Sequence, residues 1–422
     1  MSAFADWDWD IGSKRIADIE ALKKDYQWIE EIHVSPNGES SAVIVNIDEG
    51  EFNVCVNGTP WREEPFDKMW NLHYSPDGRL TAIVSEMGEW TMAVDGESWS
   101  NTFGYLWKPL FSNDGKTIAA AFQQEMKYGM VVNDVPWENT FGNMTCPTLS
   151  KDGTNCSATV QTVETSQAEI FEFQKGSYSV AQNGVVWDRN FVNVWNMSIS
   201  NDGKAVAAEV RLNLYDYTIA VNGKPWDTIF SCVWEPIFHP DNQSVIAPVR
   251  INGKWTLAQD GKIAWGGRFV QLWSPKVLPD GKHMAAIVAP SFGKWTVAVD
   301  SVPWKTCFNE MVTDLVFNET GSRIAALGKN NGRWTVIVNG TSWNNSFNRA
   351  WTPVFSANGQ YVAAKVETNG KYSIAVNDQV WSQSYDAIWG PVFSPDSTKI
   401  LCCSSSNGKI DRQVIPVKTI LK

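Results

Sequence analysis

The sequence is poor in the residues that hold metals and haem. No pair of its four histidines has ligand spacing, and two of them, His33 and His73, fall at one position of neighbouring repeats, which indicates ordinary strand residues. The seven cysteines include no Cys-x-x-Cys, so neither covalent haem nor an iron–sulfur cluster is indicated. An odd, scattered set of cysteines is typical of a reducing compartment. We therefore expect no metal and no cofactor.

Signals for nucleic-acid binding, membrane insertion and hydrolysis are also missing. The sequence has no basic run and a formal net charge of −11, which argues against a polyanionic partner because phosphate contacts need a basic face. No apolar stretch approaches the length of about 18 residues typical of a membrane span, and the start lacks the features of a signal peptide. Gly-x-Ser-x-Gly is absent and the aspartates fall in turns. We expect a cytoplasmic, non-enzymatic protein with no catalytic residues, no direct membrane span and no nucleic-acid partner.

Tryptophan, by contrast, is abundant, with 23 residues. Nine of them mark a repeat, because they are spaced by 38 or 39 residues except at one interval of 50. These nine are Trp61, Trp99, Trp137, Trp187, Trp226, Trp265, Trp304, Trp343 and Trp381. Packing between repeats explains periodic indoles better than electron hopping or sugar stacking, since a ligand site breaks repeat symmetry and these residues define it.

Each repeat carries the signals for four short strands. In one repeat, strand A is expected at 351–355, strand B at 362–364, strand C at 372–376 and strand D from Trp381. Asn-Gly or Asp-Gly pairs separate A from B and C from D, and these pairs suit type I′ hairpins because both central residues need positive φ. A repeat of about 40 residues with four strands and a periodic tryptophan predicts one blade of a β-propeller.

The two ends of the chain complement each other. Residues 5–11 alternate between apolar and acidic side chains, and Trp7 and Ile11 have the spacing of a D strand. The last repeat supplies strands A, B and C and stops before any D-strand tryptophan. We predict a single all-β propeller of about ten four-stranded blades closed by the N-terminal strand, with two five-bladed propellers as the alternative.

Two segments follow from this pattern. Residues 1–27 are expected to hold the closing strand and a short helix that Ser13 would cap, with Ile16, Ile19 and Leu22 on its apolar side. Residues 28–422 hold the propeller repeats. No linker rich in proline, glycine or serine separates any two repeats, which favours one propeller over two.

The fourth repeat departs most from the others. Its longer interval places an insertion at 161–176, between strands B and C, where alternation at 170–175 predicts an extended hairpin. The B–C connections vary along the chain while the other turns are uniform, so we expect one variable face that binds protein partners. The residues predicted to do so are Glu164, Glu169, Phe171, Glu172 and Phe173. A tolerated surface loop is the alternative interpretation.

Two resemblances add to this interpretation. The turn Ser75-Pro76-Asp77-Gly78 and its repeats at 35–38 and 394–397 resemble TolB-type and WD40-like propeller repeats, which implies the fold and no single function. The tryptophan content without haem or cluster motifs resembles the tryptophan-rich subunit of the Tmc transmembrane electron-transfer complex of sulfate-reducing bacteria. That resemblance implies a docking role on the cytoplasmic side, beside iron–sulfur and membrane cytochrome subunits. It carries over no functional residue.

Two functions of different classes follow. The first is a non-enzymatic scaffold or docking subunit of a membrane-bound electron-transfer complex, held at the inner face of the cytoplasmic membrane through its partners. The second is a propeller that binds a ligand or carbohydrate at the mouth of its central channel. Isolation from membranes with haem-containing partners would select the first, and a small molecule that stabilises the lone protein would select the second.

Overall fold

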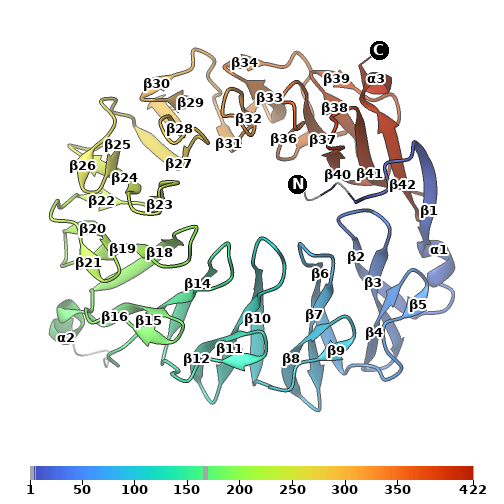
Figure 1. Cartoon of the computed structure of the whole chain (residues 1–422), viewed down its shortest axis with the longest axis horizontal. Helices are drawn as coiled ribbons and strands as arrows, with labels where there is room; N and C mark the ends of the chain where they lie inside the picture. The colour runs from blue at the N-terminus through green and yellow to red at the C-terminus, as the bar shows by residue number, and fades with distance from the viewer. Residues whose placement is uncertain (1–3, 5, 165–169, 422) are drawn as a thin grey trace. The chain divides into compact units, whose positions relative to one another are not determined.

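The chain folds into the ten antiparallel blades of a ten-blade β-propeller, and in two of them strand A is divided into two short strands. Figure 1 labels the strands. The computed structural model describes residue 4 and residues 6–164 and 170–421, with the side chains of Ile170 and Glu172 left aside. We number the blades in chain order: blade 1 is β2–β5, and blade 10 is β40–β42 completed by β1. The predicted fold class and number of blades are therefore confirmed.

Contacts divide the chain into two compact units. The first unit joins residues 1–65 to residues 276–422, and the second comprises residues 66–275. Two successive five-bladed propellers would divide the chain once, near its middle, and would leave its first and last repeats in different bodies. Here the first and last repeats share a unit, so the alternative of two five-bladed propellers is wrong.

The second unit contains blades 2 to 6. Its strands are β6 (Lys68–Tyr74), β7 (Leu80–Glu86), β8 (Glu89–Val94), β9 (Glu97–Ser98), β10 (Tyr105–Phe111), β11 (Ile118–Gln124), β12 (Lys127–Val132), β13 (Val135–Pro136), β14 (Met144–Leu149), β15 (Cys156–Gln161), β16 (Tyr178–Gln182), β17 (Val185–Val186), β18 (Asn193–Ile199), β19 (Val206–Arg211), β20 (Tyr217–Val221), β21 (Lys224–Pro225), β22 (Cys232–Val233), β23 (Ile237–Phe238), β24 (Val245–Ile251), β25 (Lys254–Gln259), β26 (Lys262–Ile263) and the start of β27 (Gln271–Val277). Helix α2 (Ile170–Lys175) lies between β15 and β16.

The first unit contains blades 1 and 8 to 10 and most of blade 7. Its strands are β1 (Gly12–Asp18), β2 (Trp28–Val34), β3 (Ser41–Asp48), β4 (Glu51–Val56), β5 (Thr59–Pro60), β28 (Met284–Ser291), β29 (Lys294–Val299), β30 (Val302–Pro303), β31 (Met311–Phe317), β32 (Ile324–Asn330), β33 (Arg333–Val338), β34 (Thr341–Ser342), β35 (Arg349–Ala350), β36 (Val354–Phe355), β37 (Val362–Thr368), β38 (Lys371–Val376), β39 (Gln379–Val380), β40 (Ala387–Phe393), β41 (Lys399–Ser406) and β42 (Lys409–Pro416). Its helices are α1 (Ile19–Leu22) and α3 (Val417–Ile420). No helix among the described residues is both long and apolar enough to cross a bilayer.

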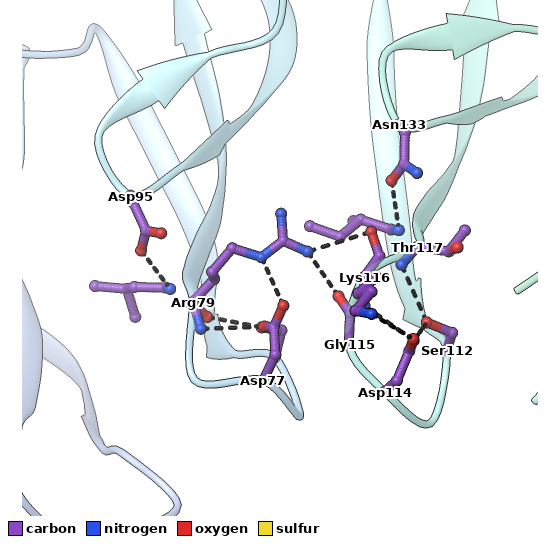
Figure 2. A network of polar contacts seen from close by, with 12 residues as sticks. Asp77, Arg79, Asp95, Ser112, Asp114, Gly115, Lys116, Thr117 and Asn133 are labelled. Carbon is purple, nitrogen blue, oxygen red and sulfur yellow. Dashed lines mark hydrogen bonds and ion pairs between the residues drawn. The ribbon is translucent and has the colours of Figure 1, made fainter. Parts of the chain in front are cut away.

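The turns between strands C and D explain the recurring asparagine and aspartate. Asn57 and Gly58 adopt φ of 50° and 87°, so both central residues are left-handed, as a type I′ turn requires. The Oδ1 atom of Asn57 also accepts a hydrogen bond of 2.8 Å from the backbone N–H of Ser41, at the start of strand B. Asp95 and Asn133 repeat this contact in blades 2 and 3 (Figure 2). A residue that tolerates positive φ and carries a short acceptor is therefore needed at this position.

The turns between strands A and B are held by serine and aspartate. In blade 3, Ser112 Oγ donates to Asp114 Oδ1 at 2.7 Å and accepts from the Thr117 N–H at 3.0 Å. The hydrogen bond from Ser112 lowers the pKa of the Asp114 carboxyl. Figure 2 shows Arg79 of blade 2 reaching this turn, where its Nη2 donates to the Gly115 carbonyl oxygen at 2.7 Å. The turn that is uniform in sequence is thus also a contact between neighbouring blades.

Strand A is bulged directly after its tryptophan. In blade 3 the register of β10 against β11 shifts between Trp107 and Leu110, and Lys108 has a φ of 53°. Pro109 falls inside this shift, where the ladder needs no N–H donor. In blades 6 and 9 the interruption divides strand A into β22 and β23 and into β35 and β36. The Trp-x-Pro pattern therefore reflects the bulge.

The N-terminal strand closes blade 10, as predicted, but a different segment does so. Strand β1 pairs with β42 from Gly12 opposite Val414 to Asp18 opposite Lys409. The assignment of residues 5–11 as the strand is wrong: described residues there form turns and bends, and Ile11 is 62% exposed. Trp7 stacks on Trp9 with ring centroids 6.2 Å apart instead of entering a blade core. Alternation alone could not distinguish this aromatic pair from a strand.

The short helix also begins later than expected. Ser13 lies within β1, so it does not cap a helix. Asp18 is the N-cap of α1, and its Oδ1 accepts from the Ala21 N–H at 3.1 Å. Ile19 packs into a buried cluster with Val43 and Ile410, so the helix covers core within the first unit.

Candidate functional site

The insertion of blade 4 is helical where it is described after residue 169. Helix α2 spans Ile170–Lys175, which corrects the prediction of an extended hairpin. The alternation of residues 170–175 is equally compatible with one and a half turns of helix, so the sequence pattern was ambiguous over so short a run. Gly176 ends the helix with a φ of 110°, and its N–H donates to the Phe173 carbonyl oxygen at 3.1 Å.

Glu164 fastens the start of the insertion to blade 3. Its Oε1 lies 2.7 Å from Lys127 Nζ at the start of β12, and this hydrogen-bonded ion pair lowers the pKa of the Glu164 carboxyl. The two residues line a cavity of about 420 Å³ together with Thr162 and Gly142. Because both side chains are largely exposed, solvent screens the pair, and its contribution to stability is small. Glu164 therefore acts first as a tether between neighbouring blades.

The other predicted partner-binding residues have different surroundings. Phe171 is 80% exposed, whereas Phe173 is half-buried. Glu169 and the side chain of Glu172 lie outside the described residues. Of the two predicted phenylalanines, Phe171 is thus the one whose side chain is largely open to solvent.

Large apolar side chains project from the B–C connections of four successive blades. Met87 is 99% exposed, Met126 81%, Phe171 80% and Tyr215 79%. We call these four residues, from blades 2 to 5, the apolar tips. The described part of the second unit has no comparably exposed Met, Phe or Tyr elsewhere. Phe171 is the one tip that was predicted from the sequence as a binding residue, and the other three tips were not predicted.

The two methionine tips stand at backbone positions that other blades give to asparagine and glycine. Met87 has a φ of 53°, and the matching residues Asn252, Asn331, Asn369 and Asn407 have φ between 49° and 53°. Met126 has a φ of 61° at the position where those four blades have glycine. A side chain without a local hydrogen bond is disfavoured in the left-handed region. The chain thus keeps methionine where turn geometry favours a smaller residue, a sign of use outside folding.

A buried carboxyl group lies on strand B of blade 5. Glu209 in β19 is only 7% exposed, and Asn196 Nδ2 of β18 donates to its Oε1 at 3.1 Å. Burial raises the pKa of Glu209 to about 7, the Asn196 hydrogen bond opposes this, and the charge of Glu235 raises it further. Most other blades have an uncharged residue at this position, such as Ile83 or Ala121. This break in the repeat is the sequence signal by which Glu209 could have been found.

The described residues show no grouping for metal or nucleophilic chemistry. No three histidine, cysteine, aspartate or glutamate side chains among them are grouped as a metal site. Burial raises the pKa of Cys156 and of Cys403 to about 12, so both thiols stay protonated at neutral pH.

Comparisons with known proteins place no function on this arrangement. No family model and no curated protein matches the chain. Among solved structures, the chain is similar to one titled "Crystal structure of the eukaryotic initiation factor", at 12% identity and a TM-score of 0.46 over 87% of this chain and 93% of that one. A likeness at this level does not bear on what the chain does.

Proposed function

We propose that this protein is a non-enzymatic docking subunit, and that a partner protein binds the apolar tips of blades 2 to 5. The observation that carries the proposal is the presence of Met87 and Met126 at strained turn positions, almost fully exposed. Folding gains nothing from either side chain, because neither is buried and an asparagine or glycine fits the turn better. Methionine is also a side chain that adapts to varied binding surfaces.

The charges beside the tips indicate the kind of surface that fits. Glu86 and Glu89 flank Met87, and Glu125 precedes Met126. Lys127 is already paired with Glu164. Exposed apolar side chains flanked by carboxylates are complementary to a partner surface with apolar pockets and a basic rim. The partner class we propose is therefore a protein with a basic docking face.

The resemblance to the tryptophan-rich Tmc subunit supports a more specific setting. In that setting the chain is cytoplasmic, and the partners are the iron–sulfur and membrane cytochrome subunits of a membrane-bound electron-transfer complex. The chain would lie at the inner face of the membrane through those partners. Its own role would be to hold subunits together and to carry no electrons.

Replacing the methionines by the residues of the other blades tests the proposal. The full-length double variant Met87→Asn, Met126→Gly should have a free energy of unfolding about 0.5 to 1 kcal/mol higher than the parent, because it relieves two disfavoured turn positions. It should recover less partner from solubilised native membranes, and adding Phe171→Ser and Tyr215→Ser should abolish recovery. A variant that gains stability while it loses partner binding has lost an interface and has not misfolded.

Exposed valines on strand D provide the matched control. Val135 and Val185 are each 68% exposed in the same unit but lie away from the B–C connections. The Val135→Thr, Val185→Thr variant should recover partners as the parent does. Full recovery of haem-containing partners by the four-residue tip variant would contradict the proposed docking surface, and absence of such partners with the parent protein would contradict the electron-transfer setting.

A further inference from the structure

A cavity lined mainly by aromatic rings lies on blades 2 and 3. Its volume is about 570 Å³, and its lining is Trp70, Tyr105, Trp107, Gln123 and Tyr128. This size falls in the usual range for small-ligand sites. Trp70 comes from strand A of blade 2, and the other four residues come from strands A, B and C of blade 3.

The rings form a continuous row. The Tyr105 ring lies 6.3 Å from Trp70 and 5.9 Å from Trp107, between centroids, with interplanar angles of 17° and 23°. Tyr128 meets Trp107 edge to face at 6.1 Å. Tyr105 is 44% exposed, so the middle ring of the row is open to solvent.

Tyr105 is the aromatic exception at its position within the second unit, whereas blade 1 of the first unit has Trp28 there. The position that it fills, at the start of strand A, holds Lys68, Asn143, Asn193 and Cys232 in the other four blades of the second unit. The tryptophans on either side belong to the repeating pattern and pack between blades. A single irregular residue therefore connects two regular tryptophans into a row, which is the signature expected of a ligand site and not of repeat packing.

The polar groups of the lining are neutral and available. They are two indole N–H groups, two phenol hydroxyls and the amide of Gln123, and no lining residue is charged. Within the described part of the chain, none of these five groups is hydrogen-bonded to another protein group. The neighbouring Gln124, by contrast, is engaged, since its Oε1 accepts from the Gly104 N–H. The cavity thus offers both donors and acceptors to a ligand.

We propose that this cavity binds a neutral saccharide. A pyranose ring presents apolar C–H faces to aromatic rings and hydroxyl groups around its edge, and each hydroxyl can both donate and accept. An anion would find no cationic side chain here, and a metal cation would find no carboxylate. A proline-rich peptide also docks on aromatic grooves, but it brings carbonyl acceptors and few N–H donors, so the acceptors of Gln123 and the tyrosines would stay unpaired.

In this site the saccharide ring stacks on Tyr105 and one flanking tryptophan, and the Gln123 amide bonds to its hydroxyls. The site is independent of the proposed docking function, because none of its five residues is an apolar tip. Either proposal can therefore fail alone.

Calorimetric and fluorescence titration of the full chain tests the assignment. The probes are cellotetraose, maltotetraose, chitotetraose and a proline-rich decapeptide. We expect at least one tetrasaccharide to bind and to change tryptophan emission, and Tyr105→Ala to weaken it about tenfold, since one stacked ring is worth roughly that factor. Tyr105→Phe should keep most of the affinity, and Gln123→Ala should lose a similar factor to Tyr105→Ala.

Phe292→Ala is the matched control, because it removes an exposed aromatic side chain that is neither in the cavity nor an apolar tip. It should bind as the parent does. Thermal melting of each variant identifies any that fail to fold, and Gln123→Ala keeps the test valid if Tyr105→Ala fails to fold. The assignment is overturned if none of the three tetrasaccharides binds, if only the peptide binds, or if binding is unaffected by both Tyr105→Ala and Gln123→Ala.

Discussion

Asn196 donates a hydrogen bond of 3.1 Å to Glu209, a carboxyl group that is otherwise enclosed by the packing of blade 5. The amide can pair with the carboxyl in either protonation state, but it does not neutralise a negative charge. Burial therefore favours the protonated acid, and the folded protein binds a proton at Glu209 more tightly than the unfolded chain does.

This relation predicts a loss of stability at neutral pH. The pKa of Glu209 is raised from 4.5 to about 7 on folding, so its favourable contribution is complete below pH 4.5 and is lost as the pH rises through about 7. The loss should be roughly 3 kcal/mol in free energy of unfolding. Urea unfolding of Glu209→Gln should show greater stability than the parent at pH 8 and a flatter dependence between pH 5 and 8. An unchanged slope would show that Glu209 titrates normally.

The contact of Arg79 with blade 3 gives a second prediction. Arg79→Met removes the hydrogen bond from Nη2 to the Gly115 carbonyl oxygen at 2.7 Å and should lower the free energy of unfolding by about 1 to 2 kcal/mol. Lys116→Met, at an exposed neighbouring side chain, should change it by less than about 0.5 kcal/mol. Equal effects in urea unfolding would mean that the contact between blades contributes nothing of its own.

Strand β1 gives a third prediction, through two truncations of different length. Deleting residues 1–18 removes β1 and exposes the edge of β42, so the melting temperature should fall strongly and the protein should aggregate more readily. Deleting residues 1–11 leaves β1 in place. It loses only contacts such as that of Lys399 Nζ with the Trp9 carbonyl oxygen at 2.9 Å, so its melting temperature should fall far less. Equal losses in calorimetry would mean that the edge pairing of β1 is not what closes blade 10.

A substitution series at Asn377 tests the turn chemistry. Asn377 has a φ of 43°, and its Oδ1 accepts from the Val362 N–H at 2.9 Å. Asn377→Gly keeps the permitted φ but loses the acceptor, whereas Asn377→Ala loses both, so stability should fall in the order Asn, Gly, Ala, by about 1 to 2 kcal/mol in total. Denaturant midpoints check the order. An alanine variant more stable than the glycine variant would show that positive φ is not the constraint.

The repeat and the turns between strands C and D could be predicted from sequence because their causes are local. The A–B turns are different, since only one residue in each, a glycine in most blades, has positive φ. Asn57-Gly58 favours a tight hairpin because both residues tolerate positive φ, and a proline marks the bulge after several of the strand-A tryptophans. The spacing of such signals predicted four strands per repeat and ten blades. It also predicted that the last blade needs a strand from the other end of the chain. These conclusions hold without knowledge of any distant contact, because each follows from the order of local signals along the chain.

Tertiary structure decided how ambiguous sequence patterns fold and which side chains are buried or exposed. Alternation at 5–11 and at 170–175 had more than one structural solution, and packing made one a turn with stacked tryptophans and the other a helix. The raised pKa of Glu209 and the aromatic row through Tyr105 also depend on the packing of neighbouring strands and blades. Desolvation and ring stacking are properties of what surrounds a side chain, and those surroundings come from segments far apart in the sequence.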